Sequence, residues 1–178
     1  MSIKEEVIKS AKMIDEMLVM QKTLNDAIMK EKWLTFGDDK FNFKTLKRAI
    51  IDEVGELNHE LKATWCWWKN TQAEPNNEKV LEELVDVWHF VMSRHYLRHE
   101  AGLTDFETDT KIIVLDGIRD ATKDEWSKDD PIIQFLESFI DLDDIVCLTY
   151  RLGYEIEDVY REYLKKNKIN FERLKNGY

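Results

Sequence analysis

The sequence contains few of the residues that make tight turns. Of its 178 residues, only six are glycine and two are proline, well below their usual combined share of about 12%. Sandwiches and barrels of β-strands need many tight turns. The scarcity of turn-forming residues therefore argues against an all-β fold.

Cysteines and long apolar runs are also scarce. The only two cysteines, Cys66 and Cys147, lie far apart and fit no metal-binding spacing. We expect two reduced core thiols, which suit a reducing cytosol. No apolar stretch approaches the roughly 18 residues that suggest a membrane span, and the opening residues Met-Ser-Ile-Lys-Glu-Glu are not typical of a signal peptide. A cytoplasmic location without membrane association is therefore expected.

Basic residues are outnumbered by acidic ones. The chain has 26 Lys and Arg against 36 Asp and Glu, a formal net charge of −10. Binding to a nucleic-acid polymer or an anionic membrane needs a cationic surface, so both partners are disfavoured. The length and the hydrophobic fraction of 43% suit one folded domain covering residues 1–178.

Apolar residues recur at helical spacing through most of the chain. The pattern predicts helices over about residues 4–33, 43–69, 78–99, 131–152 and 155–166, with a short helical tail at the end. The helix over 78–99 is apolar on most sides, which is typical of a central helix. The segment 101–130 is a candidate mobile or inserted subregion, and Lys111–Leu115 fits a strand or, preferably, a buried helical turn. The expected fold is an all-α bundle of five to seven helices.

Two acidic clusters lie on consecutive predicted helices. Glu53 and Glu56 are three residues apart, as are Glu83 and Asp86, so each pair shares one helix face. If the helices are antiparallel neighbours, the four carboxylates converge, and such a cluster is unfavourable unless cations fill it. Hard oxygen ligands of this kind suit Mg²⁺.

Other interpretations of these residues remain open. The acidic pairs also fit a solvated helix face. Glu56 and His59 form one ExxH motif of the kind found in di-iron bundles, but such a site needs a second ExxH motif, and the later helix offers ExxD instead. His95 and His99 have a spacing that suits zinc, but no third ligand is evident in the sequence.

Amides, tryptophans and a basic tail provide further candidates for binding. Gln21 and Asn25 interrupt an apolar seam, which fits either a hydrogen bond between helices or recognition of a pyrimidine edge. The run Trp65-Cys66-Trp67-Trp68-Lys69 offers both core rings and a wall for a base or sugar. The final segment 161–178 has six basic and two acidic residues, which fits a solvated helix or a set of phosphate-binding groups.

Together these residues resemble the dimeric dUTPases of the all-α NTP pyrophosphohydrolase (MazG-like) superfamily, over nearly the whole chain. The resemblance rests on the amide helix, on the ExxE and ExxD pairs and on the tryptophan run between them. It is completed by the tail residues Tyr163, Lys166, Asn170, Arg173 and Tyr178. The family often has a glutamate directly before its first acidic pair, where this chain has Asp52.

The resemblance implies Mg²⁺-dependent hydrolysis of dUTP, with attack of water on the α-phosphorus to give dUMP and pyrophosphate, and it leaves dUDP open as a second substrate. It also implies a homodimer and a helical tail that closes the site. Glu53, Glu56, Glu83 and Asp86 would bind the metal ions, and Glu53 or Glu56 would deprotonate the water. The residues implied in substrate binding are Gln21, Asn25, Trp65, Trp68, Phe90, Lys166, Asn170, Arg173 and Tyr178.

Two alternatives remain at this level. Amide side chains can turn to suit either pyrimidine edge, so a MazG-like hydrolase of dCTP or of a damaged nucleotide fits the same residues. A helical interaction module whose acidic faces bind a basic partner is the alternative without catalysis.

Overall fold

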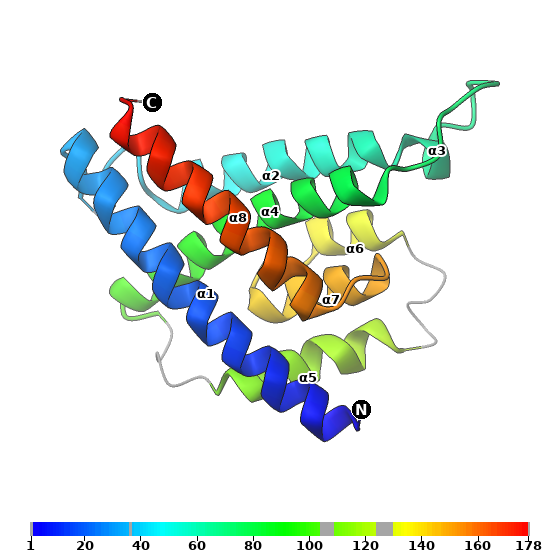
Figure 1. Ribbon diagram of the computed structural model, residues 1–178, viewed down its shortest axis with the longest axis horizontal. Helices are drawn as coiled ribbons and strands as arrows, with labels where there is room; N and C mark the ends of the chain where they lie inside the picture. The colour runs from blue at the N-terminus through cyan, green and yellow to red at the C-terminus, as the bar shows by residue number, and fades with distance from the viewer. Residues whose placement is uncertain (1, 36, 104–108, 124–129, 178) are drawn as a thin grey trace.

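The computed structural model describes residues 2–35, 37–103, 109–123 and 130–177. Within these ranges the chain forms helices and no strand (Figure 1). The helices are α1 (Ile3–Lys32), α2 (Phe43–Glu60), α3 (Lys62–Trp65), α4 (Asn77–Glu100), α5 (Thr110–Ala121), α6 (Pro131–Glu137), α7 (Leu142–Arg151) and α8 (Ile156–Lys175). The all-α prediction is confirmed for the described part of the chain.

Helix α1 is fixed at both ends by its own sequence. At its start, the Ser2 side chain accepts a hydrogen bond from the Glu5 backbone, and the Glu5 carboxylate accepts one from the Ser2 backbone, which is a capping box. At its end, Trp33 adopts a left-handed conformation with φ of 56° and donates its backbone N–H to Lys30. The buried residues of α1 recur at steps of three and four, so one face of this long helix contacts the rest of the bundle.

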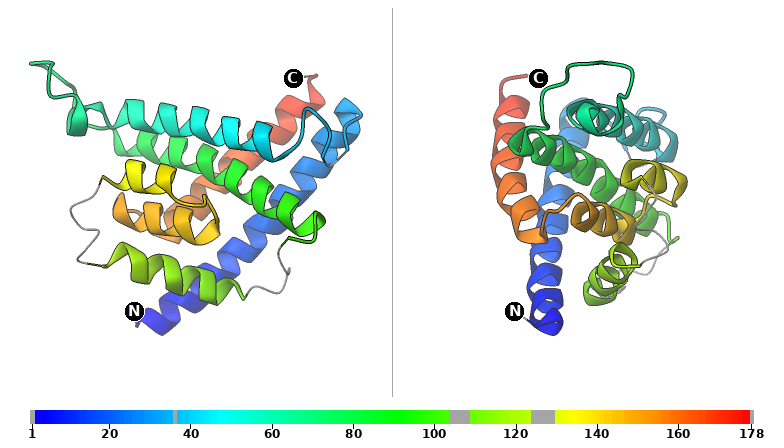
Figure 2. Two further views of the ribbon diagram at one scale, coloured as in Figure 1. Left: turned by 180° about the vertical axis from the view of Figure 1, so that it is seen from behind. Right: turned by 90° about the vertical axis from the view of Figure 1, so that its right-hand side faces the viewer.

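Helices α2 and α4 are antiparallel neighbours, with α2 at the edge of the molecule (Figures 1 and 2). Apolar residues of α4 are buried around most of its circumference, with Leu84, Val85, Val87 and Trp88 fully inaccessible to solvent. The prediction that this helix is central is confirmed, since α4 contacts α1, α2, α7 and α8.

Two predicted helices are each divided in the structure. The helix expected over 43–69 ends at Glu60, and a short helix follows after Leu61. The helix expected over 131–152 is interrupted after Glu137, where Ser138 is extended and Ile140 has a φ of 60°. The Ser138 hydroxyl donates to the Phe135 carbonyl and accepts from the Ile140 backbone, so it satisfies backbone groups that a continuous helix would otherwise bond.

In the C-terminal region, two segments that were predicted to be separate are joined. The helix expected over 155–166 and the separate tail form one continuous helix, α8. Eight helices are therefore described where five to seven were expected. Lys111–Leu115 is helical and lies within α5, as favoured from the sequence. Gly117 on α5 allows close contact with α7, because a Cβ there would lie 2.5 Å from Val146.

The arrangement of the long helices positions the candidate site. Helices α1 and α8 lie side by side, and both contact α4 (Figure 1). On the opposite side of the molecule, α7 contacts α5, α6 and α4 (Figure 2). None of the described helices is long and apolar enough to cross a membrane.

Candidate active site

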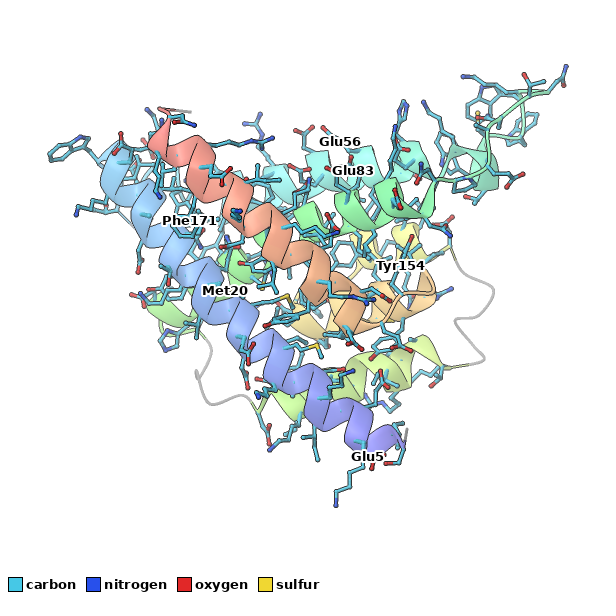
Figure 3. All side chains as sticks on the ribbon, viewed as in Figure 1. Glu5, Met20, Glu56, Glu83, Tyr154 and Phe171 are labelled. Carbon is cyan, nitrogen blue, oxygen red and sulfur yellow. The ribbon has the colours of Figure 1, made fainter. Side chains whose placement is uncertain are left out.

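Three of the predicted metal ligands converge between α2 and α4. One carboxylate oxygen each from Glu53, Glu56 and Glu83 lies within 4.8 Å of the other two. Figure 3 shows Glu56 and Glu83 next to each other on the two helices. The antiparallel pairing expected from the two acidic motifs therefore brings both motifs together.

The carboxylates of this cluster repel one another. Burial, together with the charges of Asp86, Glu56, Glu83 and Asp52, raises the pKa of Glu53 to about 7. Burial, followed by the charges of Asp86 and Glu56, also raises the pKa of Glu83. Ionisation of these carboxyl groups is thus unfavourable unless cations lie nearby. All of the atoms that could bind a metal ion here are hard carboxylate oxygens. These residues fit a divalent ion such as Mg²⁺.

Asp86, the fourth predicted ligand, lies beside this cluster and is paired with a cation. Lys166 on α8 donates to Asp86 at 2.5 Å and lies 3.1 Å from a carboxylate oxygen of Glu82. Burial raises the pKa of Asp86, and the hydrogen bond from Lys166 opposes that rise. Burial lowers the pKa of Lys166, but the carboxylates of Asp86 and Glu82 outweigh this effect. The pair links the basic half of α8 to the edge of the acidic cluster.

A pocket of about 520 Å³ adjoins the cluster and is bounded by residues of α1, α2, α4 and α8. Glu53 and Asp86 line it, as do Lys32 and Lys40. Six residues predicted to bind substrate also line it: Gln21, Asn25, Phe90, Lys166, Asn170 and Arg173. The structure therefore brings amides, an aromatic ring, cations and carboxylates from four helices to one cavity.

A buried hydrogen-bond network forms the amide side of the pocket. The Gln21 carbonyl oxygen accepts from His89 Nδ1 at 2.6 Å and from the Tyr163 hydroxyl at 3.0 Å. The Gln21 amide nitrogen donates to Asn25 Oδ1 at 3.0 Å and to Ser93 Oγ at 3.1 Å. The predicted hydrogen bonding of the two amides between helices is thus present, and it occurs within the pocket wall.

Sequence reasoning missed His89 and Ser93, and it gave Tyr163 no role. His89 and Ser93 line the pocket and follow Asp86 by three and seven residues, so helical spacing from the acidic motif would have found them. Burial, with a smaller effect of Lys166, lowers the pKa of His89 to about 3. The imidazole is therefore neutral at physiological pH.

The predicted tryptophans lie apart from the pocket lining. Trp65 donates its indole N–H to the Asn58 carbonyl at 2.9 Å, and its ring contacts Trp68, which is 58% exposed. Neither ring borders the pocket, so a role of Trp65 or Trp68 in substrate binding stays a prediction. Tyr178 lies outside the described residues.

The alternative metal sites gain no support from the described residues. His59 accepts a hydrogen bond at 2.8 Å from the Lys62 ammonium group, so the histidine of the ExxH motif is bonded to a lysine side chain. His95 and His99 join no group of three candidate metal ligands; across the described ranges, the one such group is Glu53, Glu56 and Glu83.

A helical bundle that joins a carboxylate cluster to a polar pocket with cations is typical of an all-α nucleotide hydrolase. Residues 13–178 match the sequence profile of a dUTPase family. Because this match spans most of the chain, the protein belongs to the all-α dimeric dUTPase family and is a dUTP diphosphatase. No curated protein matches the chain in sequence.

The raised pKa of Glu53 predicts how the metal-free protein responds to pH. A carboxyl group whose pKa is raised by folding stabilises the protein below its ordinary pKa of 4.5, and this contribution is lost as the pH rises through about 7. In the presence of a chelator, we expect Glu53→Gln to raise the melting temperature above that of the unsubstituted protein by an amount that grows between about pH 5 and about pH 8.

Thermal unfolding followed by circular dichroism measures this difference. Asp52→Asn, on the exposed side of the same helix turn, is the control and should give a much smaller pH-dependent difference. Equal melting-temperature differences for Glu53→Gln at both ends of the pH range would contradict the assignment of the raised pKa to this residue.

Proposed function

We propose that this pocket hydrolyses dUTP to dUMP and pyrophosphate with Mg²⁺ bound at Glu53, Glu56 and Glu83, and with Asp86 as a further ligand. The observation that carries the proposal is the position of Glu53, which belongs to the carboxylate cluster and also lines the pocket. A substrate in the pocket therefore meets the cluster directly. Bound Mg²⁺ would offset the charge of the phosphates and of the pyrophosphate leaving group.

Glu53 is the residue best suited to deprotonate the attacking water. A general base must lie within reach of the water that it activates, and Glu53 both belongs to the carboxylate cluster and lines the pocket. Glu56 is exposed on the next turn of α2 and does not line the pocket. We therefore assign the base to Glu53 and metal binding alone to Glu56.

The basic half of α8 would hold the phosphates. Lys166, Asn170 and Arg173 follow at steps of four and three residues, and all three line the pocket, so they share one helix face. In this proposal they bind the β- and γ-phosphates, and the end of the chain with Tyr178 closes over the site. Phe90 would contact the deoxyribose, and the amide side of the pocket would receive uracil.

Substitution of the carboxylates tests the catalytic assignment. We expect Glu53→Gln to lower kcat for dUTP on the order of 10²- to 10⁴-fold, the range typical for loss of a positioned acid–base group. Glu83→Gln should also lower kcat, because it removes a proposed metal ligand. The helical circular dichroism spectrum should be unchanged in both variants. The measurement is pyrophosphate release from dUTP, dCTP and dTTP with and without Mg²⁺.

Asp52→Asn is the matched control, because Asp52 precedes Glu53 but is exposed and outside the cluster. It should retain nearly full activity. Full activity of Glu53→Gln and Glu83→Gln would contradict the proposed cluster, whereas turnover of dCTP in place of dUTP would contradict the proposed substrate and support the alternative pyrimidine hydrolase.

We also propose that two copies of the chain associate through an apolar face formed by α2 and α6. Ile51, Ile133 and Leu136 are 49%, 53% and 36% exposed, and together they line a shallow hollow with Val54 and Trp65. A contiguous apolar surface of this kind is typical of a protein interface.

We further propose a cytoplasmic location for the protein. Its two cysteines are buried and form no disulfide, which supports a reducing environment.

A charge placed on the apolar face of α2 and α6 should disrupt the dimer. We expect Ile133→Asp to shift the protein toward the monomer in sedimentation velocity, because a carboxylate would lose its water in the interface. Val19→Asp, at a 65% exposed position on α1, is the control and should sediment as the unsubstituted dimer does. A dimer that persists in Ile133→Asp would rule out this face as the interface.

A further inference from the structure

The buried network around Gln21 fixes the direction of two amide groups. We propose that His89 and Tyr163 are positioning residues that orient Asn25 through Gln21, and that this orientation makes the site select uracil over cytosine. The inference rests on the proposed function, since it explains how a pocket for a pyrimidine nucleotide distinguishes the two bases.

The Gln21 carboxamide has no bonding capacity left for a base. A carboxamide oxygen accepts two hydrogen bonds and its nitrogen donates two. The Gln21 oxygen accepts from His89 and Tyr163, and its nitrogen donates to Asn25 and Ser93. Gln21 therefore lines the pocket but acts on a ligand through its neighbours.

The direction of the Gln21 amide follows from His89. The atom of Gln21 at 2.6 Å from His89 Nδ1 is an oxygen, so Nδ1 carries the imidazole proton. With the amide reversed, the proton would have to sit on His89 Nε2, which is buried and has no hydrogen-bond partner among the described residues. A buried N–H without an acceptor is rare and unfavourable, and the neutral state of this imidazole leaves only one proton to place.

Tyr163 favours the same direction. Its hydroxyl oxygen already accepts from the Asn167 amide at 3.1 Å. Its proton is then directed to the Gln21 oxygen at 3.0 Å, a shorter contact than the 3.4 Å to the Met17 carbonyl. Reversal of the Gln21 amide would replace this acceptor by a second donor.

The orientation passes from Gln21 to Asn25. Asn25 Oδ1 accepts from the Gln21 nitrogen at 3.0 Å, and Asn25 Nδ2 donates to Ser93 Oγ at 3.1 Å. The Ser93 hydroxyl lies 2.8 Å from the His89 carbonyl, which is the better acceptor for its single proton. One amide hydrogen of Asn25 bonds to no described residue, and Asn25 is 5% exposed in the pocket wall.

A single buried N–H donor can distinguish the two pyrimidines at their 4-position. Uracil has a carbonyl oxygen there, which accepts from the donor, whereas cytosine has an amino group, which would place two donors against each other. Reversal of the Asn25 amide would present an acceptor that suits cytosine. It would also point the N–H groups of Asn25 at the Gln21 nitrogen, which is itself a donor. A site that is built for one hydrogen-bonding pattern rejects the other because a buried polar group is left unpaired.

The test compares kcat/KM for dUTP and dCTP in the unsubstituted enzyme and in two variants. Tyr163→Phe removes one donor to Gln21, and His89→Phe removes the other while keeping a ring against Tyr163, whose ring centroid lies 4.5 Å from that of His89. We expect each variant to lower the dUTP-to-dCTP ratio of kcat/KM by about tenfold, the effect of one lost hydrogen bond, mainly through KM.

Thr149→Val is the matched control. It also removes one buried hydroxyl, which accepts from the Trp88 indole at 3.0 Å on the α7 side of the core, so it should lower stability without changing the ratio. An unchanged ratio in both ring variants, with an unsubstituted enzyme that selects dUTP, would overturn this inference and leave the proposed function intact. An unsubstituted enzyme that cleaves both nucleotides equally would overturn the proposed function as well.

Discussion

The repulsion among the carboxylates of Glu53, Glu56 and Glu83 is the constraint on which the site depends. Two antiparallel helices hold these groups within 4.8 Å of one another, although burial and like charge raise the pKa of Glu53 to about 7. Folding of the apolar faces of α2 and α4 imposes this arrangement. The unfavourable charge therefore favours the binding of divalent cations, which relieve the repulsion.

Helix α8 connects this acidic centre to the rest of the pocket. Its Lys166 pairs with Asp86 at the edge of the cluster, and its fully buried Tyr163 belongs to the amide network. One helix thus contributes to the charge balance near the phosphates and to the orientation of the groups proposed to read the base. An acidic protein can in this way bind a highly anionic nucleotide.

Helical periodicity and the spacing of the acidic motifs were sufficient to predict α1, α4 and the meeting of Glu53, Glu56 and Glu83. The breaks after Glu60 and Glu137 were not predictable in the same way. The second break depends on one serine that bonds the local backbone and on a positive φ at Ile140, whereas the apolar pattern continues through it. The hydrogen-bond partners of Gln21 were also out of reach, because the sequence does not show that His89 and Tyr163, 68 and 142 residues away, meet its side chain.

The most direct test of this account is the titration of Glu53 itself. Carbon-13 NMR of the side-chain carboxyl, assigned by comparison with Glu53→Gln, would follow its protonation in the metal-free protein and with saturating Mg²⁺. The account predicts a pKa of about 7 without metal and a marked fall when Mg²⁺ binds, since a bound cation favours the charged form. A pKa near the ordinary value of 4.5 in the metal-free protein, unaffected by Mg²⁺, would contradict it.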